Sequence, residues 1–479
     1  MFPVGNATWQ EARGGPAWLL ALGCALFAAM LQSLFIPLDA DVSWLITVCE
    51  AVLSGKRLYV DIVEVNPPAS VWLYLPWVGL AQLLKVRPEA VIAAAMCAGA
   101  LLSLRATLAI TARLPQPPQP VTVAAAIGFT GLILPGGLFA QREHIALLIA
   151  LPTLAAIALL GDRGRLAPRT AILAGLGAGL IVCIKPHFLL ALLLPTLWAS
   201  RRLRSPAAIF PSLAAAGVPP LLYAGATLLW APGFVDLLPM LSATYLPMHA
   251  PWTDFLISPL LTVPAVLVVS AILLRTDGGN GLAPAWLLGG VGFAFAGLLQ
   301  WKVYANHSLP GYGLAFAAVI VLLADRRGER SRRRLIGAGV GVLAAAMVSQ
   351  TATILPQPGL AEAIRRVGPP RPTLITLGCQ LVTGHPAVRH VDGRWVGSRA
   401  ALFTAAGARF VGVDRPGVRR WYDQDLALFA ADVRRERPDI VLVETTERAW
   451  LLGEPTIHAV MRDYRPVTRT GDIQVWRRR

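Results

Sequence analysis

The sequence predicts a bundle of about eleven membrane-spanning α-helices followed by a small α/β domain. First, 55% of the 479 residues are hydrophobic and only 15% are charged, whereas a soluble domain has roughly 25% charged residues. Second, long apolar runs recur from residue 17 to about residue 354, and most approach the ~20 residues that a membrane-spanning helix needs. Third, after Pro356 the apolar runs become short and arginine becomes frequent.

Eleven apolar runs are interpreted as spans. They lie at about 17–37, 89–110, 121–138, 145–160, 171–184, 188–200, 207–230, 253–274, 283–301, 309–324 and 335–354. The first run is too long for the core of a signal peptide and has no clear cleavage site, so we expect it to remain as the first helix. The segment 69–84 follows Pro67-Pro68 and is rich in Trp and Tyr. These residues favour the headgroup boundary, so an interfacial helix is expected there.

The distribution of basic residues indicates how the chain is oriented in the membrane. A cytoplasmic N-terminus puts the arginine clusters at 161–169, 201–204 and 325–334 in the cytoplasm, as the positive-inside rule requires. If 69–84 were a full span, the clusters would fall on both sides. We therefore expect a multi-pass membrane protein whose N-terminus is cytoplasmic and whose C-terminal domain is extracytoplasmic. The net charge of +16 is interpreted as a topology signal and not as a nucleic-acid-binding surface.

The domain boundary is placed after residue 358, giving a membrane domain at 1–358 and an α/β domain at 359–479. Short apolar runs at 373–378, 409–413 and 439–444 predict strands, and 421–437 predicts an amphipathic helix. Nothing in this domain looks catalytic, and it is expected to bind an acceptor glycan or to cap the bundle. The five cysteines form no CxxC pair, so neither a disulfide framework nor a zinc site is expected.

Two acids, Asp39 and Asp41, directly follow the first span. Carboxylates at a membrane boundary are costly unless they are solvated or paired. They are interpreted either as helix-capping acids of a solvated loop or as a general base. In the second case, Asp61 and Glu64 of the same loop would hold a divalent cation or orient the acceptor. Hard oxygen ligands suit Mg²⁺ or Ca²⁺.

Three further groups of polar residues lie at span ends that the topology places on the same outer side. They are Arg142, Glu143 and His144; Lys185 and His187; and Lys302, Tyr304 and His307. Each group also has a plain interpretation: internal pairing at 142–144, a snorkelling Lys185, and an aromatic belt with a snorkelling Lys302. Lys185 and Lys302 are two of only four lysines in the chain, with Lys56 and Lys85. Those positions are expected to need a compact ammonium, unless arginine usage is a bias of the chain.

The stretch DADVSWLITVCEAVLSGKRLYVDIVEVNPP, residues 39–68, resembles the first external loop of the GT-C superfamily. These polytopic glycosyltransferases include lipid A aminoarabinose transferases, protein O-mannosyltransferases and bacterial arabinofuranosyltransferases. The similarity consists of an acid at the end of the first helix, a glycine about fourteen residues later, Tyr59-x-Asp61 and Pro67-Pro68. Two departures are that Ala40 follows the first acid, where many members have Glu, and that Asn66 stands where a Lys precedes the two prolines.

The resemblance implies an inverting transfer of a sugar from a polyprenyl-phosphate donor to a glycan, lipid or protein outside the membrane. Asp41 or Asp39 would be the base, and Asp41 keeps the spacing to Gly55. Donor phosphate would be bound by Arg142, Lys185, His187, Lys302, Tyr304 and His307, and sugar, acceptor or metal by Asp61, Glu64, Glu143 and His144. No nucleotide is expected, because neither a Walker A motif nor a Rossmann glycine pattern occurs. The alternatives are a polyprenyl-linked glycan transporter or flippase, an O-antigen ligase or polymerase, and a non-catalytic scaffold.

Overall fold

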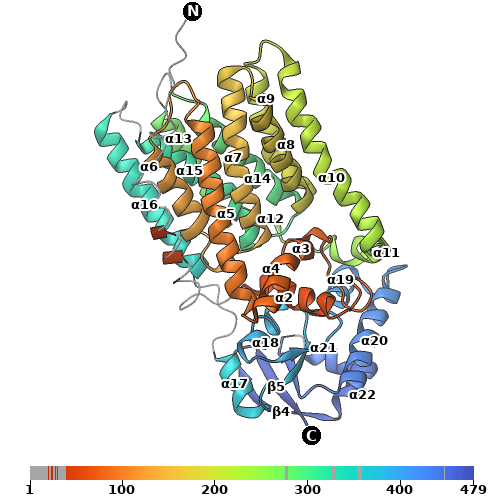
Figure 1. The fold of residues 1–479 in the computed structure, drawn as a ribbon. Coiled ribbons are helices and arrows are strands. Elements are labelled where there is room, and N and C mark those ends of the chain that lie inside the picture. The colour runs from red at the N-terminus through yellow and green to blue at the C-terminus, as the bar shows by residue number, and fades with distance from the viewer. Residues whose placement is uncertain are drawn as a thin grey trace, which may run out of the picture. The chain divides into compact units, whose positions relative to one another are not determined.

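The structure is a computed structural model (Figure 1). It describes residues 39–479 except 276–278, 325–328, 353–358 and 447, together with residues 20, 23, 24, 27, 28 and 30. The chain divides into two compact units. One comprises Met1–Ile36, Ala93–Tyr223 and Ala250–Thr353, and the other comprises Pro37–Ile92, Ala224–His249 and Ile354–Arg479. We call them the helical unit and the mixed unit.

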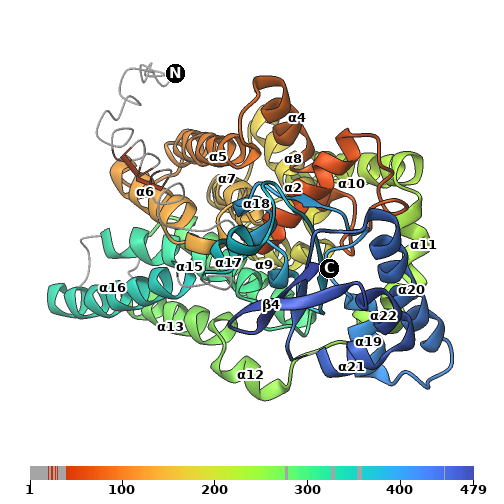
Figure 2. The same cartoon turned by 90° about the horizontal axis from the view of Figure 1, so that it is seen from below.

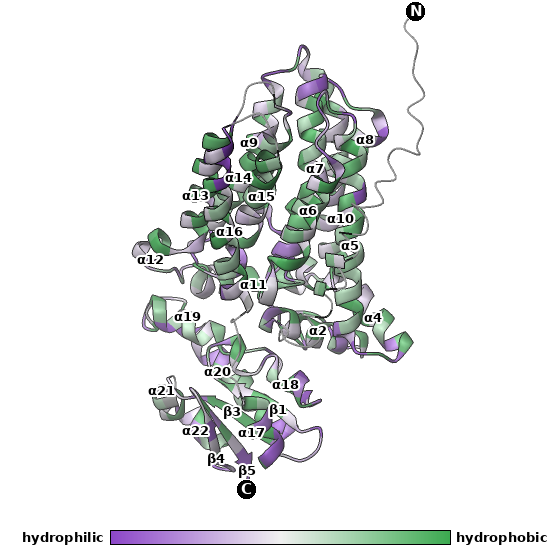
Figure 3. Ribbon diagram, turned by 90° about the vertical axis from the view of Figure 1, so that its left-hand side faces the viewer, coloured by the Kyte–Doolittle hydropathy of each residue, from purple (hydrophilic) through white to green (hydrophobic). Residues whose placement is uncertain are grey.

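The helical unit is built from apolar helices that run alongside one another (Figure 1). They are α5 (Pro88–Thr111), whose first turn belongs to the mixed unit, α6 (Pro120–Gly128), the π-helix η1 (Phe129–Ile133), η2 (Gly136–Leu138), α7 (Arg142–Arg163), α8 (Pro168–Ile184), η3 (Pro186–Phe188), α9 (Leu189–Ser200), η4 (Pro206–Ile209), α10 (Phe210–Trp230), whose last residues belong to the mixed unit, α12 (Trp252–Ile257), α13 (Pro259–Leu274), α14 (Leu282–Leu299), α15 (Ala305–Ala324) and α16 (Arg330–Ala352). Hydrophobic residues predominate along most of them (Figure 3).

Within the part of the chain that the structure describes, seven helices are long and apolar enough to cross a membrane. They are Pro88–Thr111, Arg142–Arg163, Pro206–Trp230, Trp252–Leu274, Leu282–Leu299, Ala305–Ala324 and Arg330–Thr351, and each matches a predicted span. Three other predicted spans form shorter apolar helices, Pro120–Ile133, Pro168–Ile184 and Pro186–Ser200. The span predicted at 17–37 lies largely outside the described residues. A multi-pass helical protein is therefore supported, and the count of eleven is not confirmed.

Helices α7 and α15 lie at the centre of the helical unit, where most of each helix is buried. Helix α10 has no buried stretch of this kind and exposes Leu221, Leu229 and Trp230. Exposed apolar surface on this scale is stable only against lipid or another apolar partner. The pattern agrees with a bundle whose outer helices face the bilayer.

Close helix packing depends on small residues. A Cβ added to Gly292 of α14 would meet the backbone of α9 at the Leu190 carbonyl oxygen, and would lie 2.6 Å from the Cα of Ala191. Gly290 of the same helix faces Gly311 of α15, whose carbonyl oxygen would lie 2.7 Å from an added Cβ. Glycine therefore allows α14 to approach both neighbours at backbone distance.

The mixed unit contains the segment after the first predicted span and the C-terminal α/β domain. Its helices are α2 (Ala40–Leu53), α3 (Ala69–Trp72), α4 (Leu75–Leu84), α11 (Gly233–Met240), the π-helix η5 (Leu241–Tyr245), α17 (Leu360–Val367), η6 (Leu381–Thr383), α18 (Ala387–His390), α19 (Phe403–Val411), α20 (Arg419–Glu436), α21 (Arg448–Gly453) and α22 (Pro455–Met461). Its strands are β1 (Thr373–Leu377), β2 (Arg394–Trp395), β3 (Ile440–Glu444), β4 (Tyr464–Thr470) and β5 (Ile473–Arg478).

The five strands form one sheet in the order β2-β1-β3-β5-β4. Strands β2, β1 and β3 are parallel, with Leu374 opposite Ile440, and β3-β5-β4 is antiparallel, with Leu442 opposite Val475. Buried side chains of β1 and β3 form one core with those of α19, α20 and α22. Figure 2 shows α20 and α22 on one side of β4 and α17 on the other.

Two predictions about elements of the mixed unit need correction. The run 409–413 is not a strand but the end of α19, which stops at Gly412 with φ 111°. A short apolar run does not distinguish a strand from a buried helical turn. The segment 69–84 forms two helices, α3 and α4, because Pro76 lies at the start of α4, where proline lacks the N–H that a continuous helix would use. The strands β1 and β3 and the helix α20 are confirmed.

Gly292→Ala tests the close packing of α14. We expect the free energy of unfolding to fall by roughly 1–3 kcal/mol, because the added methyl group overpacks the contact with α9. Gly217→Ala is the control, since nothing lies within 4 Å of a Cβ at that position of α10. Thermal unfolding of the detergent-solubilised protein measures both. Equal melting temperatures for the two variants would contradict the packing argument.

Candidate active site

The centre of the candidate site is an ion pair buried in the helical unit. Glu143 lies in the first turn of α7 and is fully buried, and its Oε1 atom lies 2.6 Å from Nζ of Lys185. Lys185 follows α8 with φ −150°. Pro186 explains this conformation, because a residue before proline is driven out of the helical region. The α8–η3 turn therefore directs the lysine side chain at the start of α7.

The α14–α15 turn completes this group. Gln300 accepts a hydrogen bond from Nζ of Lys185 at 3.1 Å, and Asn306 donates one to Oε1 of Glu143 at 3.2 Å. Lys302 and His307 come from the same turn and are 9% and 5% exposed. Sequence reasoning missed Gln300 and Asn306. Gln300 lies two residues before the Lys302–His307 group that it selected, and Asn306 lies within that group. The signal was therefore available as polar residues between two apolar runs.

The buried group carries an excess of positive charge. Arg142, Lys185 and His307 all lie close enough to Glu143 to act on its charge, and Lys302 acts on Lys185. Arg142, Lys185 and Lys302 are the cations of this group, and within the described residues Glu143 is the carboxylate placed among them. Buried charges are costly unless they are paired, so this arrangement favours an anion as an additional partner.

Three polar atoms in this group have no hydrogen-bond partner among the described residues. They are Oε2 of Glu143, Nε2 of His187 and Nε2 of Gln300, and all three are buried. More than about 90% of buried polar groups in proteins are hydrogen-bonded. Unsatisfied atoms beside a buried cationic cluster are therefore suited to a polar ligand.

Lys302 differs from the other cations because it can change its charge near neutral pH. Burial, together with the positive charge of Lys185, lowers the pKa of Lys302 to about 8. Tyr304 is half-exposed, and its ring centroid lies 5.4 Å from that of His307. Lys56 and Lys85, by contrast, are exposed.

His144 has a structural role in this arrangement. Its Nδ1 atom accepts from the backbone N–H of Ala140 at 3.1 Å, and Nε2 lies 2.6 Å from the carbonyl oxygen of Gly131. Both ring nitrogens are thus used by the backbone. We therefore leave His144 out of the ligand-binding group.

The remaining predicted site residues belong to the mixed unit. Asp39 is the N-cap of α2, and its Oδ1 atom accepts from the backbone N–H groups of Asp41 and Val42 at 2.8 and 3.2 Å. Asp41 lies in the first turn of the same helix, where the helix dipole favours a negative charge. The structure thus gives the two acids different roles, with the cap held by Asp39.

Comparison with known proteins gives a fold. No protein-family model and no curated protein matches the sequence. Among solved structures, ArnT from Cupriavidus metallidurans in the apo state has a TM-score of 0.56 with 14% identity, over 96% of this chain and 98% of that one. ArnT bound to undecaprenyl phosphate has a TM-score of 0.51 with 13% identity, over 96% and 97%. The chain has a GT-C fold.

The match to apo ArnT extends over 96% of this chain, so it reaches into residues 359–479. Arabinofuranosyltransferase AftD from Mycobacteria is also similar, with a TM-score of 0.49 and 12% identity, over 96% of this chain and 39% of that chain.

The acids that were predicted to hold a metal, Asp61 and Glu64, both have partners within the protein. Asp61 forms an ion pair with Arg57 at 3.1 Å, and this pairing lowers the pKa of Asp61. Glu64 is buried and accepts hydrogen bonds from the indole of Trp44 and from Asn66. Within the described ranges, no group of three or more His, Cys, Asp or Glu is arranged to hold a metal ion. We derive no step through a metal.

Lys185→Met tests the buried ion pair. Breaking such a pair leaves the partner charge uncompensated, so we expect the free energy of unfolding to fall by roughly 3–5 kcal/mol. The double variant Glu143→Gln/Lys185→Met is expected to lose less stability than Lys185→Met alone, because it removes both charges of the pair. Lys85→Met, at the exposed end of α4, is the control. Unfolding in detergent is the measurement, and a Lys185→Met variant as stable as the control would refute the pairing.

Proposed function

We propose that the chain is a membrane glycosyltransferase that moves a sugar, with inversion, from a polyprenyl-phosphate donor to an acceptor outside a bacterial inner membrane. The observation that carries the proposal is the buried cationic cluster around Glu143, with its unsatisfied polar atoms. An anionic phosphate is the ligand that such a cluster favours. The GT-C fold supports the choice of ligand, since a similar structure is that of ArnT bound to undecaprenyl phosphate.

In this proposal the cluster binds the donor phosphate. Lys185, Arg142 and Lys302 stabilise the charge that grows on the phosphate as its bond to the anomeric carbon breaks. Preorganised electrostatic stabilisation of this kind is usually the largest catalytic contribution. In this proposal Glu143 is not a catalytic residue. It holds Lys185 in place and limits the cost of burying several cations together.

Asp41 is proposed as the base. The acceptor hydroxyl oxygen attacks the anomeric carbon, its proton passes to the Asp41 carboxylate, and polyprenyl phosphate leaves as a monoester anion. The leaving group needs no proton, so one carboxylate is sufficient. Asp41 is preferred over Asp39 because it keeps the spacing to Gly55 that the resemblance implies, and because Asp39 is the N-cap of α2.

The direct test uses the purified chain in liposomes with synthetic polyprenyl-phosphate sugars. Arabinofuranose, mannose and another hexose are supplied in turn, with glycan, lipid and protein acceptors. Transfer of the sugar with release of polyprenyl phosphate is the expected result. Movement of the intact lipid-linked sugar across the bilayer without bond cleavage would replace the enzyme proposal by a flippase.

The base assignment gives a matched pair of variants. Asp41→Asn removes the proton acceptor, so we expect the transfer rate to fall about 10²–10⁴-fold. Asp39→Asn keeps a good N-cap residue, so its rate is expected to stay near that of the wild type. Initial rates at saturating donor measure both. The reverse outcome, an inactive Asp39→Asn and an active Asp41→Asn, would transfer the role to Asp39.

Lys302 predicts a pH dependence of donor binding. Because its pKa is lowered to about 8, its positive charge is lost as pH rises through that value, and the KM for the donor should increase. Arginine stays charged throughout this range. Lys302→Arg is therefore expected to shift the increase to higher pH. Identical KM profiles for the wild type and the variant would show that Lys302 does not control donor binding.

A further inference from the structure

We infer that Arg389 and His385 are positioning residues that fix helix α2 and thereby the placement of Asp41. The inference rests on the proposed function, in which Asp41 is the base. Neither residue was selected from the sequence. Both lie in the C-terminal segment 354–479, and every residue used below belongs to the mixed unit.

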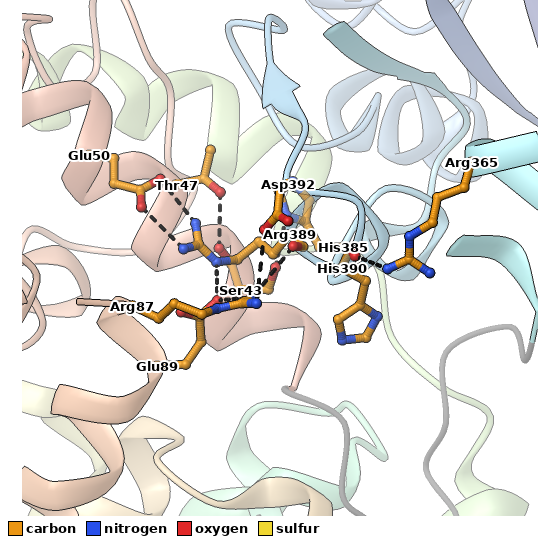
Figure 4. Close-up of polar contacts among 10 residues, drawn as sticks. All are labelled: Ser43, Thr47, Glu50, Arg87, Glu89, Arg365, His385, Arg389, His390 and Asp392. Carbon is orange, nitrogen blue, oxygen red and sulfur yellow. Dashed lines mark hydrogen bonds and ion pairs between the residues drawn. The ribbon is translucent and has the colours of Figure 1, made fainter. Parts of the chain in front are cut away.

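One face of α2 is turned toward these two residues (Figure 4). Ser43 and Glu50 are seven residues apart, which places them on the same side of a helix with 3.6 residues per turn. The Oγ atom of Ser43 lies 3.2 Å from Nδ1 of His385. Arg389 donates from Nη1 and Nη2 to the two carboxylate oxygens of Glu50 at 3.0 and 3.1 Å. The first and last turns of α2 are therefore held separately.

Arg389 also binds a third segment. Its Nε atom donates to Glu89, in the first turn of α5, at 2.7 Å. The Arg389 side chain is only 12% exposed, so this guanidinium is largely removed from water between two carboxylates. Bidentate pairs between arginine and carboxylate fix direction as well as distance. An arginine buried in this way holds α2 and the start of α5 in one arrangement.

Aromatic packing fixes the same helix from a second direction. The ring centroid of Trp44 lies 5.3 Å from that of His385 and 6.3 Å from that of Trp395. Burial and the nearby charge of Arg389 lower the pKa of His385 to about 3. The imidazole is therefore neutral at physiological pH and can pack against indole rings. Backbone pairing adds a further tie, because the N–H of Val63 donates to the carbonyl oxygen of Ser398 at 2.7 Å.

These contacts determine where Asp41 lies. It is two residues before Ser43 on a continuous helix of 14 residues, so any tilt or rotation of α2 moves its carboxylate. Glu50, the residue that Arg389 binds, is at the other end of the helix. Arg389 therefore acts on Asp41 through the helix. A displacement of 1 Å at a reacting group can cost roughly 10²-fold in rate.

The experiment compares Arg389→Ala, Arg389→Lys and Glu50→Gln in the full-length chain. Arg366→Ala is the control, since Arg366 forms an exposed ion pair with Glu362 on α17. We expect Arg389→Ala to lower kcat by roughly 10–100-fold with little change in the KM for the donor, because the donor-phosphate residues are unchanged. Arg389→Lys keeps the charge without the bidentate geometry and should retain an intermediate kcat. Arg366→Ala should match the wild type.

Hydrogen exchange supplies a readout that does not depend on catalysis. Arg389→Ala should increase exchange in residues 40–53, whereas residues 419–436 of α20 should exchange as in the wild type. Combining Glu50→Gln with Arg389→Ala should lower kcat little beyond Arg389→Ala alone, because residues in one contact are not additive. Faster exchange throughout the C-terminal segment would show unfolding, and Arg389→Lys and Glu50→Gln would then decide the question through their kcat.

A wild-type kcat in Arg389→Ala, or a loss expressed wholly in donor KM, would overturn the inference. Unchanged exchange in residues 40–53 would overturn it as well. If the wild-type chain transfers no sugar, the proposed function fails, and the exchange data alone still show whether Arg389 fixes α2.

Discussion

A carboxylate buried among cations is the interaction on which the helical unit depends. Glu143 is fully buried and contacts Lys185 at 2.6 Å, and without it several positive charges would be enclosed in apolar surroundings. An isolated buried charge costs several kcal/mol after relaxation. The pair therefore links the start of α7 to the α8–η3 turn, and the hydrogen bonds of Gln300 and Asn306 add the α14–α15 turn to the same centre. Three connections between helices are held in place by one ionic group.

Such a centre is a poor choice for stability alone. Replacing a buried ion pair by apolar residues of similar volume is often neutral or stabilising. A bundle that retains a carboxylate, its cations and several unsatisfied polar atoms gives up that simpler core. The proposed donor phosphate gives a physical reason, because an anion would offset part of the positive charge and accept hydrogen bonds from the remaining donors.

The sequence was informative where the determining forces are local. Hydropathy located the helices of the bundle, and the short runs at 373–378 and 439–444 gave β1 and β3. It failed at 409–413, where an apolar run of strand length is part of α19. Polar residues at span ends identified Glu143, Lys185 and Lys302, but not that Glu143 pairs with a lysine 42 residues away. Nor did any local pattern indicate that residues 37–92 and 224–249 belong to one unit with the C-terminal segment.

The pairing of Arg389 with Glu50 joins residues 339 positions apart. At about 5–20 residues per second, a ribosome needs roughly 17–70 s to synthesise the stretch between them. During that interval α2 has left the ribosome without the guanidinium that orders it. The acid-bearing helix is thus completed late in biosynthesis, and a chain interrupted before residue 389 would be inserted in the membrane without a finished mixed unit.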